Sequence, residues 1–263
     1  MAPLDCSWVI CSNGYDERFV AAIESCLAQD LGGAEVVVVC NGPQSRYIAD
    51  SIRRKFVHVP SVVILETEIT QLVFSLNLGV HQARGRYIAR MDADDLAYPS
   101  RLLAQFEFME SHPDVAVCGM DFDLIDDRGQ VVRRVVVRHT DALIKSKLTW
   151  SNPFCHPTTM IRKSSLLAVG GYLGGLHAED YDLWVRLSLV PGCRFASLPM
   201  AGIGYREMPQ GLARKARSAY ASVAGTQFRC FTNGFGWRWG LAAAATGIKG
   251  WVLATRKPRL ARP

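Results

Sequence analysis

Three aspartates stand close together about a third of the way along this 263-residue chain, in the run Arg90-Met91-Asp92-Ala93-Asp94-Asp95. Like charges at this spacing raise one another's free energy unless a positive charge lies among them. Hard cations such as Mg²⁺ and Mn²⁺ bind carboxylate oxygens together with phosphate oxygens of a substrate. Asp92 and Asp94, two residues apart, can face one such cation where a strand passes into a loop.

The acidic run has two other interpretations. A solvated turn rich in Asp is the plainer one, since short acidic motifs are common and Asp favours turns. Phosphatases with an aspartyl nucleophile also carry Asp-x-Asp after a strand, but near the N-terminus and followed by Thr or Val. Here the run lies deep in the chain and Leu96 follows it. The aspartates alone therefore leave a turn and a cation site open.

A second acidic group, Glu179 and Asp180, lies in the stretch His177-Ala178-Glu179-Asp180-Tyr181-Asp182. This stretch opens a predicted helix, where carboxylates stabilise the helix N-terminus by about 0.3–1 kcal/mol each. A carboxylate there also stays ionised at neutral pH, as a general base must. Helix capping and catalysis both remain possible for this group.

The elements that position these groups follow from hydrophobic patterning. Short apolar runs alternate with amphipathic stretches through the first half of the chain. This order predicts an α/β protein with a doubly wound, mostly parallel sheet, whose ligands bind at the carboxyl ends of the strands. Strands are predicted over 7–11, 35–40, 61–65 and 86–91, and helices over 16–28, 44–55, 71–84 and 99–111.

The second half is less regular. Strands are predicted over 115–119, 121–127 and 131–138, and helices over 141–150 and 179–190. Because no linker interrupts this pattern, we expect one continuous domain over 1–206. Its nucleotide half would cover about 1–118 and its acceptor half about 119–206. A separate C-terminal extension begins at 207.

Seven stretches of residues 7–206 together resemble glycosyltransferase family 2, the inverting enzymes with the GT-A fold. Single motifs are weakly specific, but their order and spacing are highly specific. The resemblance implies the GT-A fold, a Rossmann-like sheet flanked by helices, here with a basic C-terminal helical extension. The stretches are 22–29, 76–79, 83–95, 99–102, 152–160, 179–184 and 205–206.

The resemblance also implies roles for individual residues. Asp92 and Asp94 would bind Mn²⁺ or Mg²⁺ and, through it, the diphosphate of a nucleotide-sugar, in the family's D-x-D motif. Asp180 would be the base. The donor-binding residues would be Ser12, Asn13, Asn41, Arg84, Asp92, Ala93, Asp94 and Asp95. The acceptor side would contain His156, Glu179 and Trp184.

The implied reaction is inverting transfer of a sugar from a nucleotide-diphosphate-sugar, expected to be a UDP-sugar. The acceptor would be a hydroxyl of a saccharide or lipid-linked molecule in polysaccharide biosynthesis. A bound cation would stabilise the leaving diphosphate. A carboxylate on the opposite face of the sugar would take the acceptor proton, an effect of about 10²–10⁴-fold.

Two stretches depart from the family pattern. Cys40-Asn41-Gly42-Pro43 replaces the usual Asp-Asp-Gly-Ser, whose Asp binds uracil. Asn41 can accept a hydrogen bond from a base N–H, but it can also donate one, and the stretch also suits a plain turn. Cys11-Ser12-Asn13-Gly14-Tyr15 replaces the usual Pro-Thr-Tyr-Asn. The uridine preference is therefore the weaker part of the prediction.

The C-terminal extension is strongly basic. Residues 207–263 contain 10 Lys and Arg against one Glu, whereas residues 1–206 contain 20 against 23 acidic residues. A helix over 237–255 would place Arg238, Lys249 and Arg256 beside an apolar face, which suits peripheral contact of 235–262 with an anionic membrane. Packing on the catalytic domain, or a disordered tail, are the alternatives. The apolar face would comprise Trp237, Leu241, Ala244, Ile248 and Val252.

Composition excludes several other classes of protein. Hydrophobic residues make up 49% of the chain, too many for a disordered chain. No apolar run reaches the length of about 20 residues that a polytopic membrane protein needs. The eight cysteines form no C-x-x-C pair, so we expect reduced thiols in a reducing cytosol. The N-terminus lacks a secretory pattern. We therefore expect a cytoplasmic protein, with a peripheral position on the inner face of the cell membrane as the alternative.

Two other functions compete with sugar transfer. The basic, aromatic C-terminal extension could bind nucleic acid, but no RNA-recognition or zinc-finger signature accompanies it, so no nucleic acid is expected. A catalytically inactive binder of nucleotide-sugars is the other alternative. The presence of both acidic groups argues against it.

Overall fold

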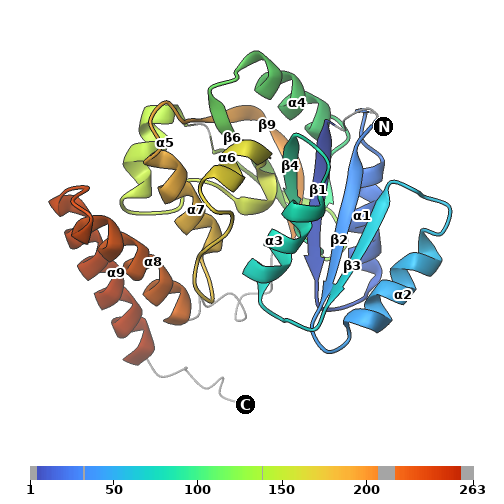
Figure 1. Cartoon of the computed structure of the whole chain (residues 1–263), viewed down its shortest axis with the longest axis horizontal. Helices are drawn as coiled ribbons and strands as arrows, with labels where there is room; N and C mark the ends of the chain where they lie inside the picture. Colours follow the sequence, from blue (N-terminus) through green and yellow to red (C-terminus); the bar gives the residue numbers. More distant parts are fainter. Residues whose placement is uncertain (1–4, 32, 138, 207–216, 256–263) are drawn as a thin grey trace.

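The computed structural model describes residues 5–31, 33–137, 139–206 and 217–255 (Figure 1). A nine-stranded sheet runs in the order β3-β2-β1-β4-β8-β6-β9-β5, and β7 pairs with β6. The strands are β1 Cys6–Ser12, β2 Glu35–Asn41, β3 Val62–Thr67, β4 Tyr87–Met91, β5 Leu96–Ala97, β6 Val115–Ile125, β7 Val131–Val135, β8 Met160–Arg162 and β9 Arg194–Arg206. The helices are α1 Glu17–Leu27, α2 Ser45–Lys55, α3 Leu72–Gln82, α4 Arg101–Ser111, α5 Asp141–Leu148, the 3₁₀ turn η1 His156–Thr158, α6 Lys163–Ala168, α7 Glu179–Ser188, α8 Arg217–Thr232 and α9 Trp237–Thr255.

The first half forms the predicted parallel sheet, in which β3, β2, β1 and β4 pair side by side. Its helices and strands end within two residues of the predicted positions. β2 is buried along its whole length, as its β-branched run requires of a central parallel strand. Asp16, at the start of α1, caps it by accepting a hydrogen bond from Phe19 N at 2.9 Å.

Two apolar layers cover the sheet, because alternate residues of each strand face opposite sides. Trp8 and Val36 face one layer, which contains apolar residues of α1, α2 and α4. Val9 and Val37 face the other, which contains apolar residues of α3, α5, α6 and α7 and extends to α8 and α9. The C-terminal helices thus share a core with the sheet.

The second half differs from prediction in its strands. β6 is one strand of 11 residues, where we predicted two separated at Met120. Its pairing with β9 shifts register at Met120 and Asp121, so the irregularity is a bulge rather than a turn. Gly119 lies where a Cβ would be 2.6 Å from the Phe154 ring, which explains the glycine within a strand. β5, β8, β9, α6 and α8 were not predicted.

The predicted helix over 237–255 forms as α9, and α8 packs alongside it (Figure 1). Buried Asp182 of α7 anchors this pair of helices. It accepts a hydrogen bond from Thr226 Oγ1 at 3.3 Å and pairs with Arg229, both on α8. Among the described residues, no helix is both long and apolar enough to cross a membrane. We call α8 and α9 the C-terminal hairpin.

A buried polar cluster closes the amino ends of β1, β2 and β4. Glu35 is 1% exposed and accepts hydrogen bonds from Ser7 Oγ at 2.7 Å and Arg84 N at 2.5 Å. Ser7 Oγ in turn accepts one from Gly85 N at 2.8 Å. A Cβ on Gly85 would lie 2.5 Å from the carbonyl carbon of Cys6 and 2.6 Å from Ser7 N. Only glycine therefore fits between β1 and the start of β4.

We expect Gly85→Ala to lower the free energy of unfolding by about 1–3 kcal/mol, because backbone atoms must move to admit the methyl group. Urea denaturation measures this change. Gly247→Ala on α9 is the matched control, since a Cβ there meets nothing within 4 Å. That variant should gain about 0.5–1 kcal/mol from the better helix propensity of alanine. Equal stability of Gly85→Ala and the wild type would contradict the close approach.

Candidate active site

The carboxyl ends of three neighbouring strands bring the predicted donor residues to one edge of the sheet. Ser12 ends β1, Asn41 ends β2, and Asp92 follows β4. Because β1 lies between β2 and β4 and all three are parallel, these residues share that edge. This is where ligands bind in open α/β sheets.

Buried arginine charge compensates the first aspartate of the acidic run. Arg90 is 4% exposed and forms an ion pair with Asp92. Burial would lower the pKa of Arg90, but the Asp92 carboxylate raises it, so the guanidinium stays charged. Arg90 thus holds Asp92 at the point where β4 ends.

The other two aspartates are under-compensated. Partial burial, and then the Asp92 charge, raises the pKa of Asp94. Asp95 is 1% exposed, and burial raises its pKa strongly, with Asp92 adding to the effect. Its Oδ1 accepts a hydrogen bond from Arg206 N at 2.8 Å, while Oδ2 is buried without a hydrogen-bond partner among the described residues.

Arg206, the last residue of β9, ties the acidic turn to the far side of the sheet. Its Nε donates to the carbonyl of Asp94 at 2.9 Å and its Nη1 to the carbonyl of Asp126 at 2.7 Å. The sequence pattern predicted Arg206 only as the last residue of the family-like region. Its contacts could not be inferred from local spacing, because Asp94 lies 112 residues away.

The acidic run fits a cation that brings its other ligands with the substrate. In the described part of the chain, no group of three or more His, Cys, Asp or Glu side chains is arranged to hold a metal by itself. Mg²⁺ and Mn²⁺ commonly bind one or two carboxylates and complete their shell with water and phosphate oxygens. The raised pKa of Asp94 and the unpartnered Asp95 Oδ2 both indicate a place where added positive charge is stabilising.

Asp180 lies in the first turn of α7. Ala178, just before the helix, has φ 60°, a left-handed conformation that is uncommon for a residue with a side chain. Asp180 Oδ2 accepts a hydrogen bond from Asn152 Nδ2 at 2.5 Å, and Oδ1 accepts one from Tyr181 N at 2.7 Å. Burial raises the pKa of Asp180, which makes the carboxylate a better proton acceptor than a solvated one.

Glu179, the neighbour of Asp180, has a different environment. Its Oε1 lies 3.7 Å from Nδ1 of His156, whose Nε2 is 3.0 Å from the Tyr172 hydroxyl. Burial alone would raise the pKa of Glu179, but its contact with His156 lowers it to about 2. Glu179 is therefore charged at every physiological pH and holds His156 in place.

A cavity of about 460 Å³ adjoins Asp180. Its walls come from both the sheet domain and the C-terminal hairpin, so the hairpin completes this side of the site. The lining residues are Trp150, Ser151, Asn152, Ala178, Asp180, Tyr181, Ala219, Tyr220, Val223, Thr246 and Lys249.

Two predicted site residues lie elsewhere. Arg84 Nε pairs with Glu35 Oε2 at 2.8 Å, at the amino ends of the strands and thus at the opposite edge from Asp92. This placement does not fit contact with a donor diphosphate. Trp184 is completely buried, and its ring packs edge-on against His156 at 5.9 Å. It supports His156 from the core rather than facing an acceptor.

The three nucleotide-side residues differ in what they can bind. Ser12 Oγ donates to the carbonyl of Gly14 at 2.8 Å, and Asn13 is exposed. Asn41 is 5% exposed, and its Nδ2 donates to the carbonyl of Thr70 at 3.3 Å. Asn41 Oδ1 is buried with no hydrogen-bond partner among the described residues. An unpaired buried acceptor costs about 1–3 kcal/mol, so this oxygen suits a donor group of a ligand.

Sequence reasoning missed Asn152 and Asp182 as individual residues. Asn152 lay inside a family-like stretch, which was a usable signal. Asp182 accepts a hydrogen bond from Arg186 Nε at 2.7 Å, a pairing that the i,i+4 spacing could have indicated. Its pairing with Arg229, 47 residues away, had no local signal.

Comparison with known proteins agrees with this architecture. The model of the family described as glycosyl transferase family 2 matches residues 7–170. The O-antigen biosynthesis glycosyltransferase WbnJ of Escherichia coli is 32% identical over 226 residues, which cover 86% of this chain and 88% of WbnJ.

Two solved structures share the fold. S. aureus TarS 1-349 in complex with UDP-GlcNAc superimposes with a TM-score of 0.65 at 17% identity, over 86% of this chain and 67% of that one. The mannosyltransferase PcManGT from Pyrobaculum calidifontis, in complex with GDP-Man and Mn²⁺, gives a TM-score of 0.64 at 16% identity. The match covers 98% of this chain and 79% of that one. The predicted GT-A fold is confirmed. With its matched domain and its similarity to WbnJ, this chain belongs to glycosyl transferase family 2 and is a glycosyltransferase.

Proposed function

We propose that this enzyme transfers a sugar from a UDP-sugar to an acceptor hydroxyl with inversion, using a divalent cation and Asp180 as the base. The observation that carries the proposal is that residues 156–159 contact both acidic groups. His156 Nδ1 lies 3.7 Å from Glu179 Oε1, and the carbonyl of Thr159 accepts a hydrogen bond at 3.0 Å from N of Arg90, which pairs with Asp92. This short segment therefore links the two acidic groups, which supports a single site with a carboxylate on each of its two sides.

Asp92 and Asp94 would hold Mn²⁺ or Mg²⁺, as the under-compensated charge of the acidic run supports. The Mn²⁺ in the PcManGT structure supports a divalent metal in a protein of this fold. When bound, the cation supplies positive charge to the leaving diphosphate. Asp95, held by Arg206 N, would position the turn that carries both ligands.

Asp180 would accept the proton of the acceptor hydroxyl. Its two oxygens are oriented by Asn152 and by the backbone of Tyr181, and its raised pKa brings it nearer the working range of a base. Attack from the face opposite the leaving group in a single displacement inverts the anomeric centre. The developing positive charge on the sugar ring, as in glycoside hydrolysis, would be close to these carboxylates.

Asn41 would select uridine. Its unpartnered Oδ1 can accept the N3–H of uracil, while its Nδ2 is already bound to the Thr70 carbonyl. An asparagine amide can donate through Nδ2 or accept through Oδ1. Because Nδ2 is bound to Thr70, Oδ1 is the atom left to accept a hydrogen bond from the ligand. The UDP-GlcNAc bound to TarS supports a uridine donor in a protein of this fold.

The acceptor would be a saccharide or a lipid-linked saccharide that enters the cavity beside Asp180. Trp150 and Tyr220 line that cavity, and such rings combine an apolar face with a polar edge, which suits sugar rings. The O-antigen role in the name of WbnJ supports a place in polysaccharide biosynthesis.

The first test concerns the cation. With Mn²⁺, a UDP-sugar at 100 times its Kd should stabilise the wild type by about 2.7 kcal/mol in a thermal-shift assay. Asp94→Asn should lose this stabilisation and the sugar-transfer activity, because a cation ligand is gone. Glu107→Gln, at an exposed carboxylate of α4, is the control and should behave as wild type. Full activity and stabilisation in Asp94→Asn would remove the proposed metal site.

A second test concerns the nucleotide. At equal concentration, UDP should stabilise the enzyme more than GDP in the presence of Mn²⁺, since Asn41 Oδ1 can pair with uracil N3–H. UDP methylated at N3 should not stabilise the wild type more than GDP does. Unmodified UDP should not stabilise the Asn41→Leu variant more than GDP does. Stronger stabilisation by GDP would contradict the assignment of Asn41.

A third test concerns the base. Asp180→Asn should reduce kcat by about 10²–10⁴-fold while leaving donor binding intact. Because Asp180 must be ionised, the rate should fall as pH falls, with a midpoint above the ordinary aspartate pKa of 3.8. Asn152→Ala removes a hydrogen bond that lowers this pKa, so the midpoint should move to higher pH. Thr246→Val, which lines the cavity without bonding to Asp180, should alter only the KM for the acceptor. An unchanged midpoint in Asn152→Ala would argue against Asp180 as the base.

A further inference from the structure

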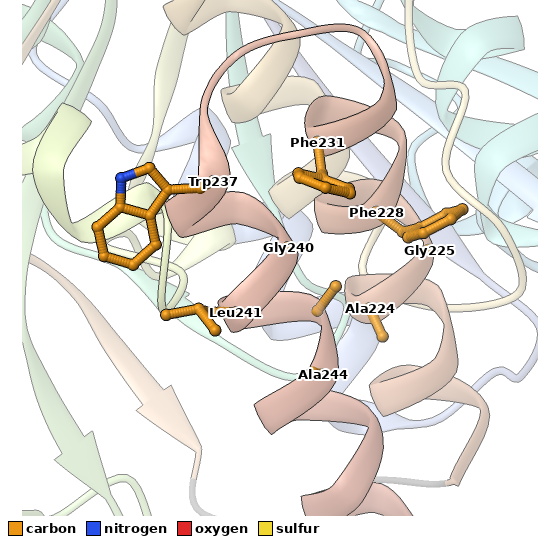
Figure 2. A pocket seen from close by; sticks show the side chains of 9 residues that line it. Ala224, Gly225, Phe228, Phe231, Trp237, Gly240, Leu241 and Ala244 are labelled. Atoms are coloured by element: carbon orange, nitrogen blue, oxygen red, sulfur yellow. The ribbon is translucent and has the colours of Figure 1, made fainter.

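The C-terminal hairpin carries an open apolar groove of about 800 Å³ that sugar transfer does not explain (Figure 2). Figure 2 shows Phe228 and Phe231 of α8 on one side of it and Trp237 and Leu241 of α9 on the other. Among the residues that the structure describes, no charged one lines the groove. The lining residues are Ala224, Gly225, Phe228, Phe231, Trp237, Gly240, Leu241, Ala243 and Ala244.

The groove belongs to a larger apolar face. Trp237 is 66% exposed, Ile248 62% and Trp251 69%. At about 100° per residue, these side chains point the same way along α9. Trp239 and Ala242 point away from them and are buried against the rest of the molecule. The hairpin therefore uses one face to pack and leaves an opposite, aromatic-rich face open.

Basic residues accompany this face. Arg238 is exposed on the side of α9 next to it. Lys249, also exposed, lies between this face and the cavity beside Asp180, with its Nζ 5.9 Å from the centre of the Tyr220 ring. Neither α8 nor α9 contains an Asp or Glu. Arg256, the third residue of the predicted basic edge, and the rest of 256–262 lie outside the described residues.

We propose that this open face is a docking surface for an anionic lipid membrane. An apolar stripe with aromatic side chains enters the headgroup layer, and the flanking cations contact acidic lipid headgroups. Charge argues against a second copy of the chain as the occupant. Two such faces in contact would bring basic residues together with no acidic residue on either helix to pair with them.

Docking in this way would hold the acceptor cavity about one helix diameter, roughly 10 Å, from the lipid surface. Thr246 and Lys249 line the cavity beside Asp180 from the same helix whose other side forms the open face. An acceptor sugar held by a lipid anchor would then enter the cavity from the membrane. This consequence rests on the proposed function, whereas the docking itself does not.

The test is flotation of the full-length protein with lipid vesicles, which needs no activity. The wild type should float with vesicles of phosphatidylglycerol and phosphatidylcholine and much less with phosphatidylcholine alone. A Trp237→Ser and Trp251→Ser double variant should lose about tenfold or more in partition coefficient. Arg238→Ser should lose about fivefold, as expected for one cation near an anionic surface.

The matched control is Tyr47→Ser with Val57→Ser, because both residues are exposed apolar side chains near α2, outside the hairpin. It should float like the wild type. Circular dichroism checks that each variant is folded. Hydrolysis of the UDP-sugar in solution should be unchanged in the hairpin variants, which separates this test from those of Asp94 and Asp180.

Three results would overturn the proposal. They are failure of the wild type to float, equal flotation with neutral and anionic vesicles, and unchanged flotation of the double Trp variant. A concentration-dependent dimer without lipid, abolished by the same double variant, would instead identify the face as an interface between two copies. Sedimentation velocity of the wild type and the double variant distinguishes that outcome.

Discussion

Repulsion among the carboxylates that follow β4 is the constraint on which the donor side of the structure depends. Cationic and hydrogen-bond donor groups compensate part of the charge of Asp92, Asp94 and Asp95. Arg90 does so from β4 itself, and Arg206 from the end of β9. β9 runs beside β6 and pairs with β5, and this pairing brings Arg206 to the acidic turn. Charge compensation thus links the site to strands that carry no reacting group.

The three carboxylates at the start of α7 contact different partners. Glu179 lies beside His156, and Asp180 accepts a hydrogen bond from Asn152. Asp182 pairs with Arg186 of α7 and Arg229 of α8. Only Asp180 combines a raised pKa with a position on a cavity. The same four-residue stretch can therefore supply a base, position a histidine and anchor the C-terminal hairpin.

Hydrophobic patterning predicted the helices and strands whose formation depends on residues near to one another in the sequence. The β-branched run of β2 and the Asp16 cap of α1 are visible in the sequence, and both elements form where expected. β5 and β8 have two and three residues, too few to show periodicity, and they exist because longer strands lie beside them. The surroundings of Arg84 have the same origin. A basic residue before an acidic strand end looked available for phosphate, but Glu35, 49 residues away, pairs with it. Pairings across such separations are set by topology, which the sequence pattern gives only in outline.

The C-terminal hairpin shows why packing and membrane contact need not be alternatives. A helix presents several faces, and Trp239 and Ala242 already pack on the domain while Trp237, Ile248 and Trp251 remain exposed. Burying a large aromatic side chain contributes roughly 1.5–3 kcal/mol, so leaving several in water is unfavourable unless something covers them. Because Asp182 fixes the hairpin to α7, whatever covers that open face is held in a constant position relative to Asp180. The net charge is negative over residues 1–206 and positive over residues 207–263. The acidic body would face a cation and its diphosphate, and the basic hairpin would face the surface on which the acceptor is presented.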